Sequence, residues 1–169
     1  MPTEYAICDP RLRLEPGPPG ARGLFLTRSL TDAEKGYEVI GGRLQPKRLT
    51  VYDVVTGNNF LSHLRDHVRP RQTGNLVFGV LFDLPQINDF YRPEVAFVPY
   101  SSWPPARRLP AGEAWSVVPA LVVEVIGSDH GAERAALRAS DYLRAGVSAV
   151  WVVRTDIWEV HQYSAHNVS

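Results

Sequence analysis

Two apolar stretches, "RPEVAFVPYSSW" (92–103) and "PALVVEVIGSDH" (119–130), each carry one acid at a predicted β-strand. Glu94 opens the first apolar run, and Glu124 lies in the middle of the second. A buried carboxylate costs several kcal/mol unless it is paired, hydrogen-bonded or bound to a metal. The sharpest interpretation is a metal ion shared by the two acids. The alternatives are that both acids face solvent at strand ends, or that an arginine neutralises each.

The segments around these strands predict an α/β domain with a mixed central β-sheet flanked by helices. Apolar residues at helical spacing predict helices, and glycines mark a hairpin turn and a helix end. An irregular loop is expected over residues 99–118. The other expected elements are a hairpin around residues 40–42, a helix over 50–68 that "TGNN" (56–59) interrupts, a strand over 74–85, the strands of Glu94 and Glu124, a helix over 131–147, and a hairpin around 154–156.

The composition is that of one globular domain of 169 residues. Residues 1–23 are rich in Pro and Gly and predict an extended N-terminal arm, with the domain over 24–169. Cys8 is the single cysteine, which excludes a disulfide framework and a CxxC zinc site. No apolar run approaches the roughly 18 residues of a membrane span. We therefore expect a cytoplasmic protein without a membrane partner.

The charged residues limit the possible chemistry. The 18 basic and 18 acidic residues give a net charge of zero, so no global field draws in nucleic acid. Lys35 and Lys47 are the only lysines, and every other basic residue is an arginine. Chemistry that needs a lysine must use one of these two.

Four stretches carry a resemblance to a known family: "GYEVIGGRL" (36–44), "YRPEVAFV" (91–98), "PALVVEVIGS" (119–128) and "RASDYLRAGVSAVWVV" (138–153). In this order and approximate spacing they resemble the Uma-two family of restriction endonucleases, part of the PD-(D/E)XK nuclease superfamily. The resemblance covers about residues 36–163. It implies a restriction-endonuclease-like fold and DNA as the substrate.

The resemblance also implies roles for particular residues. Glu94 stands at the family's motif aspartate and Glu124 at its second acid. Glu38 matches a further acid that would complete the site from the hairpin. The superfamily's lysine position, two residues after the second acid, holds Ile126, and in this family the lysine comes from the following helix. That helix position holds Arg138, a phosphate or transition-state contact in this interpretation.

Phosphodiester hydrolysis explains why these residue types belong together. A divalent cation neutralises charge on the scissile phosphate and lowers the pKa of the attacking water. Mg²⁺ often uses one or two carboxylates together with water and phosphate oxygens. Glu94, Glu124 and the backbone carbonyl of Val125 are the expected ligands for Mg²⁺ or Mn²⁺. A homodimer is expected too, because two sites related by a two-fold axis cut both strands.

Two departures from the family pattern keep a second hypothesis open. Glu94 replaces aspartate, and Arg138 replaces a lysine with a cation that cannot lose its proton. The alternative is a catalytically inactive module that keeps the nuclease fold for binding or assembly. In it, Arg138 forms a salt bridge to Glu94 or Glu124 where no metal binds. His63 and His67, four residues apart, lack a third zinc ligand and are expected on a solvated helix face.

Overall fold

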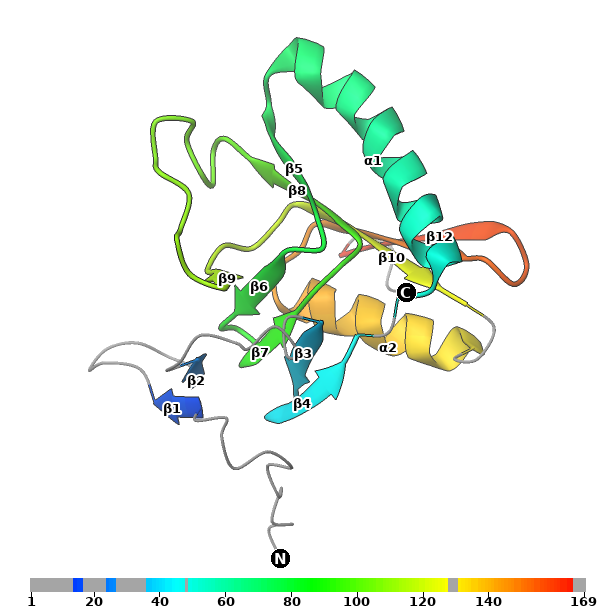
Figure 1. Ribbon diagram of the computed structural model, residues 1–169, viewed down its shortest axis with the longest axis horizontal. Coiled ribbons are helices and arrows are strands. Elements are labelled where there is room, and N and C mark those ends of the chain that lie inside the picture. The colour runs from blue at the N-terminus through cyan, green and yellow to red at the C-terminus, as the bar shows by residue number, and fades with distance from the viewer. Residues whose placement is uncertain (1–13, 17–23, 27–35, 48, 128–130, 166–169) are drawn as a thin grey trace, which may run out of the picture.

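The computed structural model describes residues 14–16, 24–26, 36–47, 49–127 and 131–165. Within these ranges lie two long helices and strands of several lengths (Figure 1). The elements in chain order are β1 (Leu14–Pro16), β2 (Leu24–Leu26), β3 (Tyr37–Ile40), β4 (Arg43–Pro46), α1 (Val51–Arg71), β5 (Gly74–Phe78), β6 (Leu81–Leu84), β7 (Asp89–Tyr91), β8 (Val95–Pro99), β9 (Ala114–Trp115), β10 (Leu121–Ile126), α2 (Gly131–Arg144), β11 (Ala149–Arg154) and β12 (Glu159–Ser164).

A mixed five-stranded sheet forms the centre of the fold, with the order β12-β11-β10-β8-β5. Strands β10 and β11 are parallel, and the other neighbours are antiparallel. Helix α1 packs on one face and α2 on the other (Figure 1). The expected architecture, a mixed central sheet flanked by helices, is therefore confirmed.

Alternation along β10 decides which helix each of its side chains meets. Val123 and Val125 pack with Leu61 of α1. Val122 and Ile126 pack in the core that includes Ala139 of α2. Glu124 alternates with the α1-facing valines, so its side chain is directed to the α2 side of the sheet. One strand thus covers α1 with apolar groups and presents an acid toward α2.

A second five-stranded sheet, with the order β4-β3-β7-β6-β9, packs beside the α2 side of the central sheet. The predicted hairpin is its β3–β4 pair, which turns through Gly41 and Gly42 at φ values of 58° and 72°. Both values lie in the left-handed region that glycine adopts at little cost. Asp89 Oδ1 accepts a hydrogen bond from Gly41 N at 2.7 Å and holds this turn. Strand β4 then returns the chain toward the central sheet at Lys47.

Helix α1 runs without a break through the "TGNN" segment, so the expected interruption is wrong. A capping box starts the helix: Thr50 Oγ1 accepts from Asp53 N at 3.2 Å, and Asp53 Oδ2 accepts from Thr50 N at 2.8 Å. Close packing explains why residue 57 is a glycine. A Cβ atom there would lie 2.9 Å from Phe78 Cε2 and 3.1 Å from Glu94 Cβ. The glycine lets the helix approach Glu94 closely.

Two other expected boundaries differ from the structure. The strand predicted over residues 74–85 is two strands, β5 and β6, which belong to different sheets. Gly79, at φ 61°, turns the chain between them. The helix predicted over 131–147 ends at Arg144, and Gly146 adopts φ 98° just beyond it. The irregular loop over 99–118 contains one short strand, β9.

The N-terminal region is described only in part. Strands β1 and β2 pair antiparallel with each other, on either side of the boundary expected at residue 23. The remainder of the expected arm lies outside the described residues, and the boundary stays a prediction. Among the described helices, none combines the length and apolar character needed to cross a membrane.

Gly57→Ala is expected to lower the free energy of unfolding by about 1 kcal/mol. In an unobstructed helix the same change would raise it by about 1 kcal/mol. Overpacking against Phe78 and Glu94 typically costs about 1–3 kcal/mol and reverses the sign. Urea denaturation measures the difference. Ser62→Ala, at an exposed position of the same helix, is the control and should change stability by less than about 0.5 kcal/mol.

Candidate functional site

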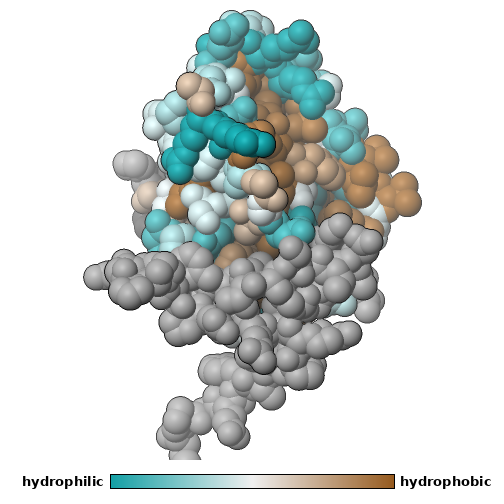
Figure 2. Space-filling model, turned by 60° about the vertical axis from the view of Figure 1, so that its left-hand side comes forward, coloured by the Kyte–Doolittle hydropathy of each residue, from teal (hydrophilic) through white to brown (hydrophobic). Residues whose placement is uncertain are grey.

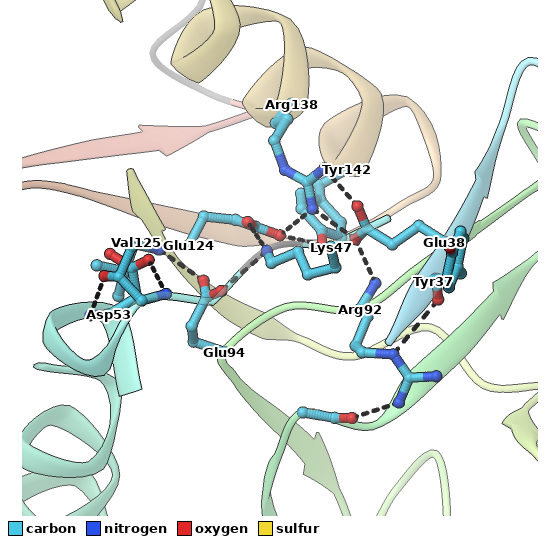
Figure 3. Close-up of polar contacts among 12 residues, drawn as sticks. Tyr37, Glu38, Lys47, Asp53, Arg92, Glu94, Glu124, Val125, Arg138 and Tyr142 are labelled. Carbon is cyan, nitrogen blue, oxygen red and sulfur yellow. Dashed lines mark hydrogen bonds and ion pairs between the residues drawn. The ribbon is translucent and has the colours of Figure 1, made fainter. Parts of the chain in front are cut away.

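Four of the residues proposed from sequence lie in one buried cluster (Figure 3). Glu38 comes from β3, Glu94 from the residue before β8, Glu124 from β10 and Arg138 from α2. The three acids are 1–2% exposed and the arginine 5%. Both sheets and α2 therefore contribute charge to one centre, and none of these acids faces solvent.

Lys47 lies between the two strand acids, a position that no sequence motif predicted. Its Nζ atom is 2.9 Å from Glu94 Oε1 and 2.8 Å from Glu124 Oε2. It follows β4 directly, so the β3–β4 hairpin delivers it to the acids of the central sheet. The one available signal was composition, because Lys35 is the only other lysine in the chain.

Arg138 joins Glu38 to Glu124. It donates to Glu38 through Nη1 at 3.0 Å and Nη2 at 2.7 Å, and Nη2 also lies 2.7 Å from Glu124 Oε1. The Arg92 backbone N–H donates to Glu38 at 2.7 Å, and the Tyr142 hydroxyl donates to Glu124. The salt bridge considered in the inactive alternative is thus present at Glu124. Arg138 pairs with Glu38 and not with Glu94.

The two carboxylate oxygens of Glu94 differ in their hydrogen bonding. Its Oε2 accepts from the Val125 backbone N–H at 2.6 Å. Its Oε1 lies within ion-pair distance of Lys47, but no described group is aligned to donate a hydrogen bond to it. The Lys47 charge balances this oxygen, so a metal ion bound there would share it with the lysine.

The cluster shifts the pKa values of its two strand acids in opposite directions. Burial raises the pKa of Glu94 to about 7, against an ordinary 4.5, and Lys47 offsets only part of that effect. Burial also acts to raise the pKa of Glu124, but the charges of Arg138 and Lys47 outweigh it and lower the value to about 2. Burial acts to lower the pKa of Lys47, yet Glu124 and Glu94 leave it above its usual value. Glu124 is accordingly the permanent anion, and Glu94 exchanges its proton near neutral pH.

The raised pKa of Glu94 predicts a pH-dependent stability in metal-free protein. The native carboxyl binds a proton more tightly than the unfolded one, so its contribution is full below pH 4.5 and is lost as the pH rises to about 7. Unfolding in EDTA should therefore show a fall of up to about 1.4 kcal/mol per pH unit in this window. Glu94→Gln should lack that component. Parallel pH profiles for the two proteins would contradict the assignment.

A cavity of about 390 Å³ opens beside the acids. Its lining includes residues that the sequence interpretation did not select, among them Asp53 of the α1 capping box and Arg134 of α2. The charged or polar groups and the proposed backbone ligand on its wall are Gln45, Lys47, Asp53, Glu124, Val125, Arg134 and Arg138. The cluster is therefore reachable from one side, with cationic groups on the approach.

The histidines considered from sequence lie elsewhere. His63 and His67 are exposed on α1 and border a separate groove. His130, beside the Glu124 strand in sequence, lies outside the described residues. Neither helix histidine takes part in the acid cluster.

The fold has a counterpart among solved structures. A crystal structure from Anabaena variabilis, described as "a putative nuclease belonging to DUF820", matches with a TM-score of 0.65 and 18% identity. The match covers 80% of this chain and 75% of that one. A comparison with curated proteins found no match. The protein is thus an α/β protein with a nuclease fold.

Within that class the family is shown by sequence. The model of the Uma2 family, described as "Putative restriction endonuclease", matches residues 25–167. The chain belongs to this family, and the resemblance drawn from its four motifs is confirmed.

Proposed function

We propose that the protein is a metal-dependent endonuclease that hydrolyses phosphodiester bonds in DNA. The observation that carries the proposal is the pair of buried acids Glu94 and Glu124, which share one counter-charge, Lys47 Nζ, at 2.9 and 2.8 Å. The cavity gives a substrate access to Glu124 and Lys47, while Glu94 lies behind them and does not line it. Membership in the Uma2 family supports the same reaction.

The residues fit a hard divalent cation such as Mg²⁺ or Mn²⁺. We assign two carboxylates, Glu94 and Glu124, as its ligands, since no group of three or more His, Cys, Asp or Glu side chains among the described residues is placed to hold a metal ion. Mg²⁺ is often held in this way, with water and substrate phosphate completing the shell. The Val125 N–H faces Glu94, and in an extended strand the carbonyl of the same residue points to the same side. That supports Val125 as a third ligand.

Each protein group then has a defined task. A bound cation neutralises phosphate charge and acidifies the attacking water. Lys47 holds Glu94 and Glu124 side by side and, at the cavity wall, stabilises charge that develops on the phosphate. Arg138 acts as a positioning residue, because its terminal nitrogens are committed to Glu38 and Glu124. Glu38 holds the Arg138 side chain in place, and the Tyr142 hydroxyl does the same for Glu124.

The inactive-module alternative also has an observation in its favour. Lys47 and Arg138 already neutralise Glu124, which is sufficient for a structural ion-pair network without a metal. The two hypotheses differ in whether Glu94 and Glu124 together gain a cation. A homodimer, proposed for cutting both strands, is tested separately by light scattering.

Cation-induced stabilisation discriminates between the hypotheses. Mg²⁺ or Mn²⁺ at 100 times its Kd should stabilise the protein by about 2.7 kcal/mol and raise Tm by about 5–10 °C. Glu124→Gln should abolish this shift. Glu159→Gln, which alters an exposed acid of β12, should keep it. An equal response of all three proteins, or none in the wild type, would favour the inactive module.

A further inference from the structure

An aromatic pair stands at the edge of the candidate site. Tyr52, the second residue of α1, and Trp158, in the β11–β12 turn, form an edge-to-face contact with ring centroids 5.8 Å apart. Trp158 is 81% exposed and Tyr52 43%. The other tryptophans are at least partly buried, so Trp158 is the one whose ring lies largely in solvent.

The pair is joined to the cavity through the backbone. Tyr52 immediately precedes Asp53, which lines the cavity. On the other side, Thr155 N donates to the carbonyl of Ile126, another cavity residue, at 3.2 Å. Trp158 lies three positions after Thr155, a span of at most about 10 Å. In Figure 1 the β11–β12 turn projects beside the beginning of α1.

The backbone at Trp158 makes an aromatic residue an unfavourable choice for the turn alone. Its φ of 58° lies in the left-handed region, where glycine or asparagine is less strained. Val51 beside the pair is also exposed, at 82%. On the face that Figure 2 brings forward, away from this turn, hydrophobic residues (brown) also reach the surface between hydrophilic regions (teal). The turn therefore holds a large flat ring in water next to a cavity with cationic walls.

We propose that Trp158, supported by Tyr52, stacks on an unpaired nucleobase of the DNA strand whose phosphate enters the cavity. This rests on the proposed function and deepens it, since the substrate becomes a strand with an unpaired base next to the scissile phosphate. Aromatic side chains stack on any base, because every base presents a flat π-face. Arg134, partly exposed on the cavity wall, complements a phosphate that accompanies the base. A partner protein would be complemented by the apolar groups alone.

Binding without cleavage tests the proposal. The probes are a labelled single-stranded oligodeoxynucleotide and its blunt duplex, bound in EDTA to protein carrying Glu124→Gln. Adding Trp158→Ala should weaken single-strand binding by about 5- to 150-fold and leave duplex binding unchanged. Trp158→Phe should restore most of the affinity. Leu137→Ala, which removes another exposed apolar side chain, on α2, is the control and should change neither affinity.

The outcomes separate this proposal from the proposed function. Unchanged single-strand binding by the Trp158→Ala protein overturns the stacking role, even if the wild type nicks plasmid DNA. Selective loss of single-strand binding supports stacking, even if hydrolysis is never seen. Light scattering tests whether a second copy of the protein binds this surface instead. A dimer that Trp158→Ala converts to monomer, with single-strand affinity per protomer unchanged, would make the pair a contact between copies and overturn stacking.

Discussion

Replacing Lys47 with methionine is expected to lower the rate of DNA cleavage by about 100- to 1,000-fold, the usual cost of removing one group that stabilises transition-state charge. Methionine keeps much of the side-chain volume and removes the ammonium that lies 2.9 Å from Glu94 and 2.8 Å from Glu124. The measurement is the initial rate of supercoiled plasmid nicking at saturating Mg²⁺ or Mn²⁺.

Two further variants define the role of Lys47. Lys47→Arg keeps the charge in a larger, planar group and is expected to retain only part of the activity. Arg65→Met removes an exposed cation from α1, away from the cavity, and should leave the rate nearly unchanged. Wild-type nicking by the Lys47→Met protein would show that this lysine only neutralises its neighbours.

Glu124→Ala is expected to cost about 3–5 kcal/mol of stability, in addition to abolishing cleavage. The carboxylate accepts hydrogen bonds from Lys47, Arg138 and the Tyr142 hydroxyl. Its loss leaves the two buried cations incompletely paired. Urea denaturation of metal-free protein measures the change. Glu159→Ala removes an exposed acid and should cost less than about 0.5 kcal/mol. A loss below about 1 kcal/mol for Glu124→Ala would mean that the network contributes little to folding.

Local sequence pattern was sufficient to find the acids. Glu94 and Glu124 were identified because each interrupts or adjoins a strand-like apolar run, and burial then demands a partner. The answer combines two of the original interpretations. Glu124 is neutralised by Arg138, as one alternative held, while Glu94 is paired with a lysine, and the shared metal ion stays a proposal.

Long-range geometry accounts for what the sequence did not predict. Lys47 lies 77 residues before Glu124, and only the packing of the β3–β4 hairpin on the central sheet brings them together. Residues 74–85 divide into two strands at Gly79 because the strands belong to separate sheets, and a single apolar run does not show this. Gly57 suggested a break in the helix, because sequence pattern does not show that a glycine here allows close packing against Glu94. The resemblance directed attention to Arg138 for the cationic role and thereby away from Lys47.

Metal-dependent hydrolysis is measured as cleavage of supercoiled plasmid by wild type and Glu124→Ala, each with Mg²⁺, Mn²⁺ or EDTA. We expect nicking by the wild type that requires the cation and disappears in the variant, with melting curves confirming that the variant is folded at the assay temperature. Cleavage that persists in the folded Glu124→Ala protein, or a wild type that neither cleaves nor binds the cation, would contradict this expectation.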